Sequence, residues 1–220
     1  MDKLIIVANL KSYMNEIEGK NWLDEFLKHK DEIQESENKE IIIAPSFTLL
    51  LSFNSALVDT NMELASQNLS PFDEGAYTGE VNAKQIKDFA SFVIIGHSER
   101  RGYFNETDKN LSEKVNLALK YGLSPIYCVQ SSETFIPEGV RIIAYEPTFA
   151  IGSGNPDTPE NAEKVCGDFM NKNSNYSILY GGSVTSENVS SFTKNGKIKG
   201  VLVGGGSLDP LEFIKIIKNA

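Results

Sequence analysis

Short apolar runs alternate with longer amphipathic stretches along nearly the whole chain. Most of the runs are unbroken rather than alternating with polar residues, which is typical of parallel strands that are covered on both faces. The runs predict eight strands, at residues 4–9, 40–44, 63–67, 92–96, 124–129, 141–145, 177–181 and 199–204.

The stretches between these runs carry apolar residues at helical spacing. In the first of them, Trp22 and Phe26 lie four residues apart and charged residues fill the opposite face. Such patterns predict seven helices, at residues 18–30, 47–58, 82–90, 107–121, 158–171, 185–193 and 210–219. A strand followed by a helix, repeated along the chain, is the signature of a parallel α/β fold.

Eight strand–helix units fit either a closed barrel or an open, doubly wound sheet. An open sheet of the dinucleotide-binding kind carries a glycine-rich fingerprint after its first strand, where this chain has ANLKSYM. Its glycine clusters come late instead, at residues 180–183 (YGGS) and 203–206 (VGGG). These positions end the last two strands, where barrel enzymes commonly bind phosphate. We therefore expect a single (β/α)8 barrel domain over residues 1–220.

One connection is too short for the repeating pattern. Only eleven residues, 130–140, separate the fifth run from the sixth, and a crossover usually needs at least about 10–12 residues including its helix. Pro137 and Gly139 leave room for about one helical turn. The sequence predicts that the helix between strands five and six is shortened or missing, with residues 135–137 (FIP) packed over the exposed barrel wall.

The charge of the chain narrows the set of partners. Thirty acidic residues against 21 basic ones give a formal net charge of −9, which disfavours nucleic acid and anionic membranes. A phosphorylated substrate would have to be held by a few cations and by backbone N–H groups.

Cys128 and Cys166 lack a metal-ligand spacing and are expected to be reduced thiols of a cytoplasmic protein. The apolar run at the N-terminus is too short for a membrane span, and we do not interpret it as a cleavable signal.

Polar residues follow several of the strands, at the end of a barrel where function collects. Lys11 is either a solvated loop lysine or a fixed cation beside a developing oxyanion, oriented by Asn9. His97 follows the apolar run FVIIG and is either a structural group or a hydrogen-bond donor to a carbonyl. Glu146 ends an apolar strand, where a carboxylate is costly to bury. Two interpretations of Glu146 stay open: it is either one half of a structural ion pair or a catalytic base.

The segment after Glu146 favours the catalytic interpretation. Residues 147–154, called the lid below, have a stiff start at Pro147, an apolar middle and a glycine-rich end. Such a hinged segment excludes water when it closes. The glycine turns at 180–183 and 203–206 would direct backbone N–H groups toward one corner, where they can hold a phosphate dianion.

A series of motifs occurs in order at the ends of the expected strands. They are residues 9–11 (NLK), 65–68 (ASQN), 75–80 (GAYTGE), 94–101 (IIGHSERR), 144–147 (AYEP), 150–154 (AIGSG), 179–184 (LYGGSV) and 203–205 (VGG). Together they resemble the triosephosphate isomerase family over nearly the full length of the chain. This resemblance implies a TIM barrel, a glycolytic interconversion of D-glyceraldehyde 3-phosphate and dihydroxyacetone phosphate, and no metal or organic cofactor.

The resemblance also implies a role for each site residue. Glu146 would remove a carbon-bound proton and return it to the neighbouring carbon, and His97 would be the neutral electrophile at the carbonyl. Lys11 would neutralise the enediolate with the help of Asn9, and Glu99 would support Lys11. The neutral histidine and the closing lid are known properties of this family rather than consequences of the spacing. The phosphate would be held by Gly152, Ser183, Gly204 and Gly205.

A homodimer is implied in the same way. Residues 68–80 would be the long third loop, which in this family inserts into a partner subunit and would bring Thr78 toward the active site there. Leu10 and Phe149 stand where the family usually has tryptophan, so we expect altered lid kinetics rather than lost chemistry. The short connection at 130–140 replaces a full helix of the family.

Two other functions stay open at this point. The chain could be another phosphate-binding barrel enzyme, an isomerase or aldolase of a larger sugar phosphate. An aldolase needs a Schiff-base lysine well inside the barrel, and none of the eight runs has a lysine at its centre. A catalytically inactive barrel retained for binding or scaffolding would not need Lys11, His97 and Glu146 together.

Overall fold

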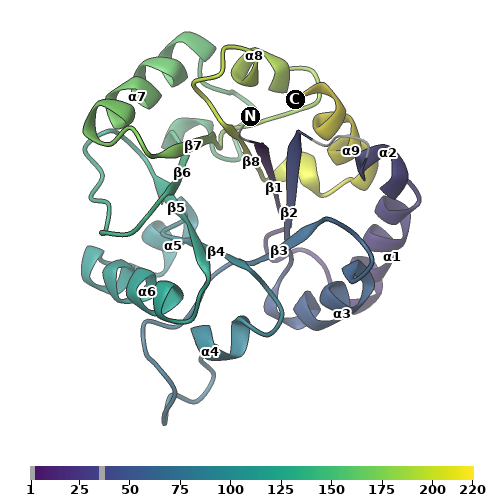
Figure 1. Cartoon of the computed structure of the whole chain (residues 1–220), viewed down its shortest axis with the longest axis vertical. Helices are drawn as coiled ribbons and strands as arrows, with labels where there is room; N and C mark the ends of the chain where they lie inside the picture. The colour runs from purple at the N-terminus through teal and green to yellow at the C-terminus, as the bar shows by residue number, and fades with distance from the viewer. Residues whose placement is uncertain (1–2, 35–37) are drawn as a thin grey trace.

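The eight apolar runs form the parallel strands of a closed barrel in the computed structural model, which describes residues 3–34 and 38–220 (Figure 1). The strands pair in sequence order, and the barrel closes where Ala8 lies opposite Val203. Each strand boundary falls within one residue of its prediction. The strands are β1 (Leu4–Asn9), β2 (Lys39–Ala44), β3 (Glu63–Ser66), β4 (Phe92–Ile95), β5 (Ser124–Val129), β6 (Ile142–Tyr145), β7 (Ser177–Tyr180) and β8 (Gly200–Val203).

Helices surround the strands (Figure 1). Several begin with the expected caps: Thr107 accepts a hydrogen bond from the N–H of Asn110 at 3.3 Å, and Pro159 follows the cap Thr158. The helices are α1 (Glu16–Leu27), α2 (Lys30–Gln34), α3 (Phe47–Leu57), α4 (Ala83–Ile86), α5 (Ser98–Tyr103), α6 (Asp108–Lys120), α7 (Pro159–Lys172), α8 (Val189–Thr193) and α9 (Pro210–Asn219). Two 3₁₀ turns add η1 (Thr148–Ala150) and η2 (Gly205–Ser207).

The helix predictions were wrong in four places. The helix expected over 185–193 begins only at Val189, because residues 186–188 form a turn. The segment 18–30 is not one helix, because α1 ends at Leu27 and α2 begins at Lys30. The helix expected over 82–90 is a single turn, α4, followed by turn hydrogen bonds to the carbonyl of Ile86. The pattern missed α5 altogether, because none of its six residues is buried and no apolar stripe marks it.

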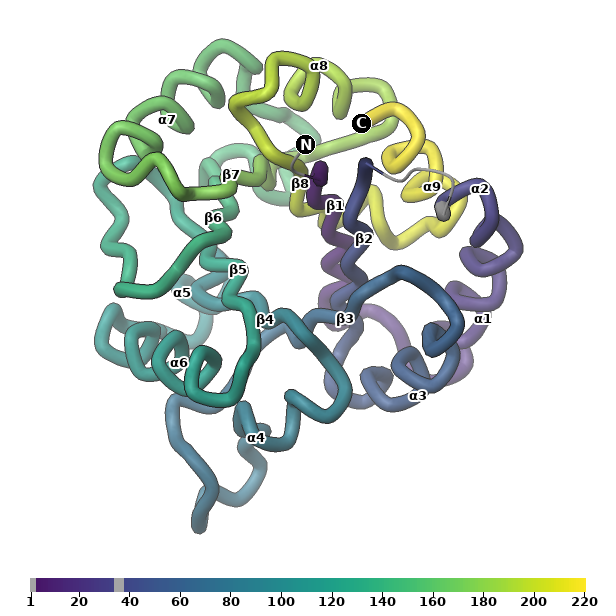
Figure 2. The backbone as a smooth tube through the Cα atoms, viewed as in Figure 1, coloured from purple at the N-terminus to yellow at the C-terminus, as the bar shows by residue number. Residues whose placement is uncertain are grey.

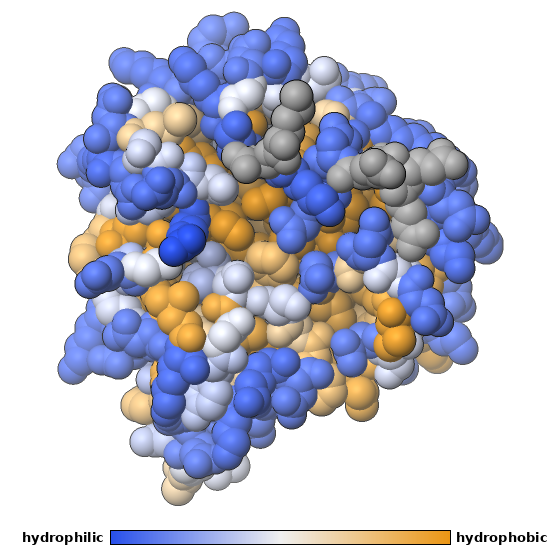
Figure 3. All heavy atoms as spheres, viewed as in Figure 1, coloured by the Kyte–Doolittle hydropathy of each residue, from blue (hydrophilic) through white to orange (hydrophobic). Residues whose placement is uncertain are grey.

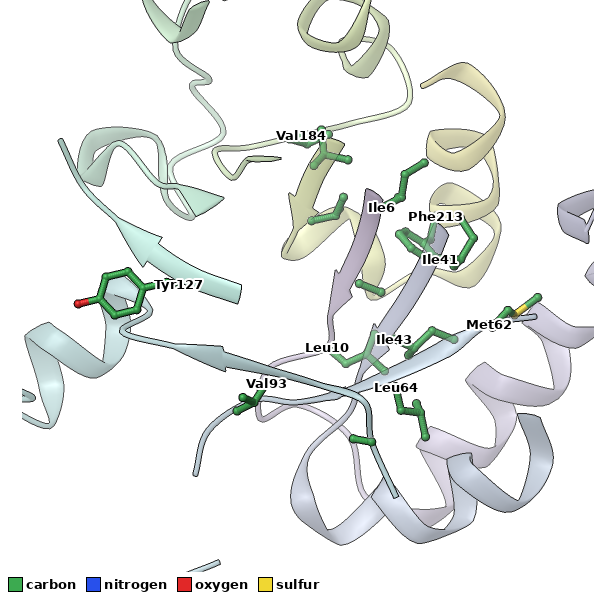
Figure 4. Packing of buried hydrophobic residues seen from close by; sticks show 14 of the residues in the cluster. Ile6, Leu10, Ile41, Ile43, Met62, Leu64, Val93, Tyr127, Val184 and Phe213 are labelled. Atoms are coloured by element: carbon green, nitrogen blue, oxygen red, sulfur yellow. The ribbon is translucent and has the colours of Figure 1, made fainter. Parts of the chain in front are cut away.

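Alternate residues of the strands serve two separate cores. In β1, Ile5 and Val7 belong to a cluster that draws on all eight strands and on no helix, so this cluster fills the barrel. Ile6 belongs to the larger cluster between the strands and the helices, and Figure 4 shows it beside Phe213 of α9. This alternation is the period of two that a strand imposes. It gives the rigid frame on which the strand-end residues are mounted.

The connection from β5 to β6 contains turns and bends but no helix within residues 130–141. Figure 2 shows this connection as a bent loop without helical coils on the side of the barrel between α6 and α7. Ile136 packs against the outer core and Pro137 is buried, whereas Phe135 is 49% exposed. The expectation that all three residues cover the barrel wall was therefore wrong for Phe135. Single exposed apolar side chains are ordinary on protein surfaces, so burial of its two neighbours does not require burial of Phe135.

This connection is held to both neighbouring helices. Gly139 lies against α6, since a Cβ built there would be 2.5 Å from Cδ1 of Leu119. On the other side, Nζ of Lys172 in α7 donates a hydrogen bond to the carbonyl of Ser132 at 2.5 Å. The barrel wall is thus spanned at this point without a helix.

Hydrophilic residues cover most of the outer helices on the face drawn in Figure 3, and hydrophobic residues gather toward the centre. Amphipathic helices that pack their apolar faces inward produce this distribution. Across residues 3–34 and 38–220, none of the helices combines the length and the apolar character needed to cross a membrane.

Candidate active site

The carboxyl ends of the strands surround a cavity of about 370 Å³. Two residues of the predicted site lie outside its lining: Glu99 contacts Lys11 and His97 from the side, and Thr78 lies on the loop at 68–80. The others come together in the lining as the sequence predicts. They are Asn9, Lys11, His97, Glu146, Gly152, Ser183, Gly204 and Gly205.

His97 is fixed through both ring nitrogens. The chain turns at Gly96, with φ of 73°, and His97 then caps the N-terminus of α5. Its Nδ1 accepts a hydrogen bond from the backbone N–H of Glu99 at 3.2 Å, and its Nε2 lies 2.9 Å from Oε1 of Glu146. A nitrogen that accepts an N–H carries no proton, which assigns the ring proton to Nε2. The histidine therefore presents an N–H to Glu146 and to the cavity.

Glu146 is a nearly fully buried carboxylate, 1% exposed, immediately after β6. Its Oε2 accepts a hydrogen bond from the backbone N–H of Ser98 at 3.0 Å, and its own N–H donates to the carbonyl of Val129 at 2.8 Å. Gly181 leaves room for the side chain, since a Cβ there would be 3.2 Å from Cγ of Glu146. The carboxylate is thus held between β5, β7 and the first turn of α5.

Opposing influences act on the charge of the histidine. Burial lowers the pKa of His97, but the carboxylates of Glu146 and Glu99 outweigh burial and leave the pKa raised. The N–H that Glu99 directs at Nδ1 opposes protonation there, since a protonated nitrogen could not accept it.

Burial, followed by the charge of Glu146, holds the pKa of Cys128 well above its ordinary value. Cys128 therefore stays a neutral thiol next to the carboxylate.

Lys11 stands on strained backbone at the end of β1. Its φ of 54° lies in the left-handed region, which a lysine rarely occupies. Its N–H donates to Oδ1 of Asn9 at 3.1 Å, and its carbonyl accepts from Nε2 of Gln67 at 2.8 Å. The ammonium group forms an ion pair with Glu99. Its stem lies over Gly204, where a Cβ would be 3.1 Å from Cε of Lys11.

The glycine turns that follow β7 and β8 also line the cavity. Ser183 also has a positive φ, 47°, and its hydroxyl donates to the carbonyl of Ala150 in the lid at 2.6 Å. After Gly204 the chain enters η2, whose first N–H groups have no acceptor inside the turn. Gly205 and Gly206 line the cavity and present backbone rather than side chains. This corner suits an anion, because backbone N–H groups bind phosphate without basic residues.

Two contacts of the site had no assigned role in the sequence reasoning. The N–H of Ser98 binds Glu146, and the amide of Gln67 joins the carbonyls of Lys11 and Ala44, each at 2.8 Å. Gln67 could have been noticed in the sequence, because it is a polar residue at the end of a strand. The contact of Ser98 could not, because it is made by a backbone N–H, which every residue except proline has. Within the described ranges, no cluster of three or more His, Cys, Asp or Glu side chains is arranged to hold a metal ion.

The family model described as Triosephosphate isomerase matches residues 4–139 and 138–220, which is nearly the whole chain. The chain belongs to the triosephosphate isomerase family. The resemblance drawn from the strand-end motifs is confirmed. The two matched segments meet at residues 138–139, inside the connection that lacks a helix, so this member of the family departs from the family model at that connection.

Curated relatives named Triosephosphate isomerase align with the chain from end to end. The protein of Mesomycoplasma hyopneumoniae is 39% identical, that of Thermodesulfovibrio yellowstonii 38% and that of Dictyoglomus thermophilum 37%. The alignments cover 99–100% of this chain and 100% of each relative. They extend over 242 to 253 positions against 220 residues here, so these relatives carry segments that this chain lacks.

Proposed function

We propose that this protein interconverts D-glyceraldehyde 3-phosphate and dihydroxyacetone phosphate, with Glu146 as the base. The observation that carries the proposal is the buried pair of Glu146 and His97, 2.9 Å apart in a cavity that is also lined by the glycine turns after β7 and β8. A carboxylate, a hydrogen-bond donor and an anion site are the three groups that this reaction needs. Membership of the triosephosphate isomerase family supports the same reaction.

The reaction moves one proton between adjacent carbons. Glu146 removes a proton from the carbon next to the carbonyl. The electron pair of that C–H bond forms a carbon–carbon double bond, and the π pair of the carbonyl moves onto its oxygen to give an enediolate. The Nε2–H of His97 donates to this oxygen and transfers the proton that the two oxygens exchange. Lys11 balances the negative charge. Glu146 then returns its proton to the neighbouring carbon, which completes the isomerisation.

Substrate binding must separate the catalytic pair. In the ligand-free protein, Glu146 is bonded to His97 and to the N–H of Ser98. A substrate entering the cavity takes the place of His97 as the neighbour of the carboxylate. Since Glu146 is the main influence that raises the pKa of His97, its departure favours the neutral ring. The neutral ring still donates from Nε2, so it serves as the electrophile.

The phosphate belongs at the glycine corner. We assign its binding to Gly152, Ser183, Gly204 and Gly205, whose backbone supplies N–H groups that offset the acidic net charge. The lid closes over it from residues 147–154 and already contacts this corner through the bond from Ser183 to Ala150. Closure would exclude water from the enediolate, which protects it from side reactions.

We also propose a homodimer, with the loop at 68–80 as its interlocking element. This loop projects beyond α4 in Figure 1. The rings of Phe72 and Tyr77 on it stack at 4.4 Å, yet they are 47% and 44% exposed. Thr78 follows these aromatics and would reach the partner's site.

We also propose that the protein is located in the cytoplasm. Cys128 and Cys166 are both free thiols, which supports this location.

The proposal is tested by isomerisation of D-glyceraldehyde 3-phosphate, coupled to reduction of dihydroxyacetone phosphate by NADH. The same reaction run in D₂O should place deuterium on the carbon that receives the proton. Absence of turnover by the folded protein, measured at a concentration where light scattering shows a dimer, would exclude this function. Turnover of a larger sugar phosphate in its place would favour a different barrel enzyme.

A further inference from the structure

We propose that Asp157 is a positioning residue that joins the two ends of the lid to each other through Tyr145. Tyr145 directly precedes the proposed base Glu146, and Asp157 comes three residues after the lid ends. The hydroxyl of Tyr145 donates to Oδ2 of Asp157 at 3.4 Å across twelve positions of the chain. The lid is thereby closed into an Ω-loop with neighbouring ends. The kinetic part of this inference rests on the proposed function.

The carboxylate of Asp157 is the centre of a small network. Besides Tyr145, its Oδ1 accepts from the N–H of Thr158 at 2.8 Å and its Oδ2 from Nδ2 of Asn161 at 2.7 Å. Its backbone N–H donates to the hydroxyl of Tyr180 at 2.8 Å. Asp157 therefore connects the start of α7 with the ends of both β6 and β7.

The buried carboxylate of Asp157 is held by hydrogen bonds rather than by an ion pair. Asp157 is 8% exposed, and none of the ion pairs found in the described part of the chain involves it. Burying a carboxylate is expensive unless hydrogen bonds satisfy it. Of the three bonds that do so here, the one from Tyr145 reaches across the lid, whereas those from Thr158 and Asn161 are local.

The contact with Tyr180 ties the lid to the phosphate corner as well. A Cβ on Gly182 would lie 2.6 Å from the hydroxyl of Tyr180. Only a glycine at this position leaves room for the hydroxyl to lie against the glycine turn after β7. The ring of Tyr180 is held by stacking on Phe192 at 4.0 Å. Asp157 is thus anchored by an immobile partner on β7, and its side chain is aimed at Tyr145 on β6.

The bond between Tyr145 and Asp157 is long for an O–H···O hydrogen bond, which usually measures about 2.5–3.0 Å. Hydrogen bonds that support catalysis are often long in ligand-free proteins and tighten in the complex. Lid closure that draws Tyr145 toward the anchored Asp157 shortens this bond and orders the residue before Glu146. Closing the lid and placing the base are then one event.

Hydrogen exchange of the ligand-free protein tests the link without any substrate. Asp157→Ala and Tyr145→Phe should each speed exchange of the amides at 148–155 by about threefold to tenfold, the effect of one hydrogen bond. The double variant should add little to either. Asn161→Ala is the matched control, because it removes another bond to the same carboxylate and leaves Tyr145 in place. Its lid should exchange at the wild-type rate.

Steady-state kinetics test the consequence for the base. Tyr145→Phe and Asp157→Ala should raise KM and lower kcat by about threefold to tenfold together, and Asp157→Asn, which keeps an acceptor for Tyr145, should recover most of the loss. Wild-type lid exchange in Tyr145→Phe would overturn the proposal, as would full additivity in the double variant. If Asp157→Ala does not fold, Tyr145→Phe and Asp157→Asn still decide it. Wild-type protein without isomerase activity refutes the proposed function and leaves the exchange test standing.

Discussion

Nε2 of His97 lies 2.9 Å from Oε1 of Glu146, and both side chains are almost completely buried. In the ligand-free protein the proposed base and the proposed electrophile are therefore each other's partner. The contact offsets the cost of burying a lone carboxylate. It also makes the charge of the histidine depend on the position of the carboxylate.

Glu146→Gln should lower the pKa of His97 in the free protein. The charge of Glu146 is the largest of the influences that raise this pKa, and without it burial prevails. The measurement is an NMR titration of the imidazole C–H signals. The chain has two histidines, so His29→Gln assigns them. A pKa of His97 that stays the same or rises in Glu146→Gln would contradict the geometry described above.

Gly200→Ala should destabilise the protein by at least about 3 kcal/mol or prevent folding. Gly200 has φ of 150°, and a Cβ there would lie 1.8 Å from the carbonyl oxygen of Ile5, so β8 and β1 could not remain paired. Gly167→Ala is the control. It lies within α7 with no atom within 4 Å of a new Cβ, and it should stabilise the fold by about 0.5–1 kcal/mol. Urea unfolding of both variants gives the comparison, and equal effects would argue against the register of barrel closure.

Neither cysteine should react with a disulfide reagent at pH 8 in the native protein. Burial raises the pKa of Cys166 to about 12 and that of Cys128 well above its ordinary value, so the reactive thiolate is absent from the folded state at this pH. The raised pKa means that ionisation opposes folding: stability falls as the pH rises from the ordinary thiol pKa toward 12. Reaction should be complete once guanidinium unfolds the chain. Rapid native reaction would show that the barrel opens locally at one of these positions.

The strands could be predicted closely because both of their faces are buried, so each appears as an unbroken apolar run with polar residues at its end. The same reasoning selected the candidate site residues, since Asn9, His97 and Glu146 each stand where a run stops. Parallel strands bring all these ends to one side of the barrel. Eight of the predicted site residues line one cavity for this reason.

The parts that escaped prediction depend on contacts that no local pattern records. α5 has no apolar stripe, because it lies at the rim of the barrel and buries none of its residues. The link from Tyr145 to Asp157 joins residues that only the folded lid brings together. The left-handed backbone of Lys11 is held by Asn9 and Gln67, and a lysine in the sequence gives no sign of it.

The most direct test of the account is the turnover of Glu146→Gln beside that of wild type. Removing the base should lower kcat by about 10³-fold or more, with a smaller change in KM, because a positioned general base contributes about 10²–10⁴-fold and the amide cannot accept the proton. Glu160→Gln, an exposed position on α7, controls for the loss of one negative charge and should match wild type. A Glu146→Gln protein that retains turnover within about tenfold of wild type would contradict the assignment of the base.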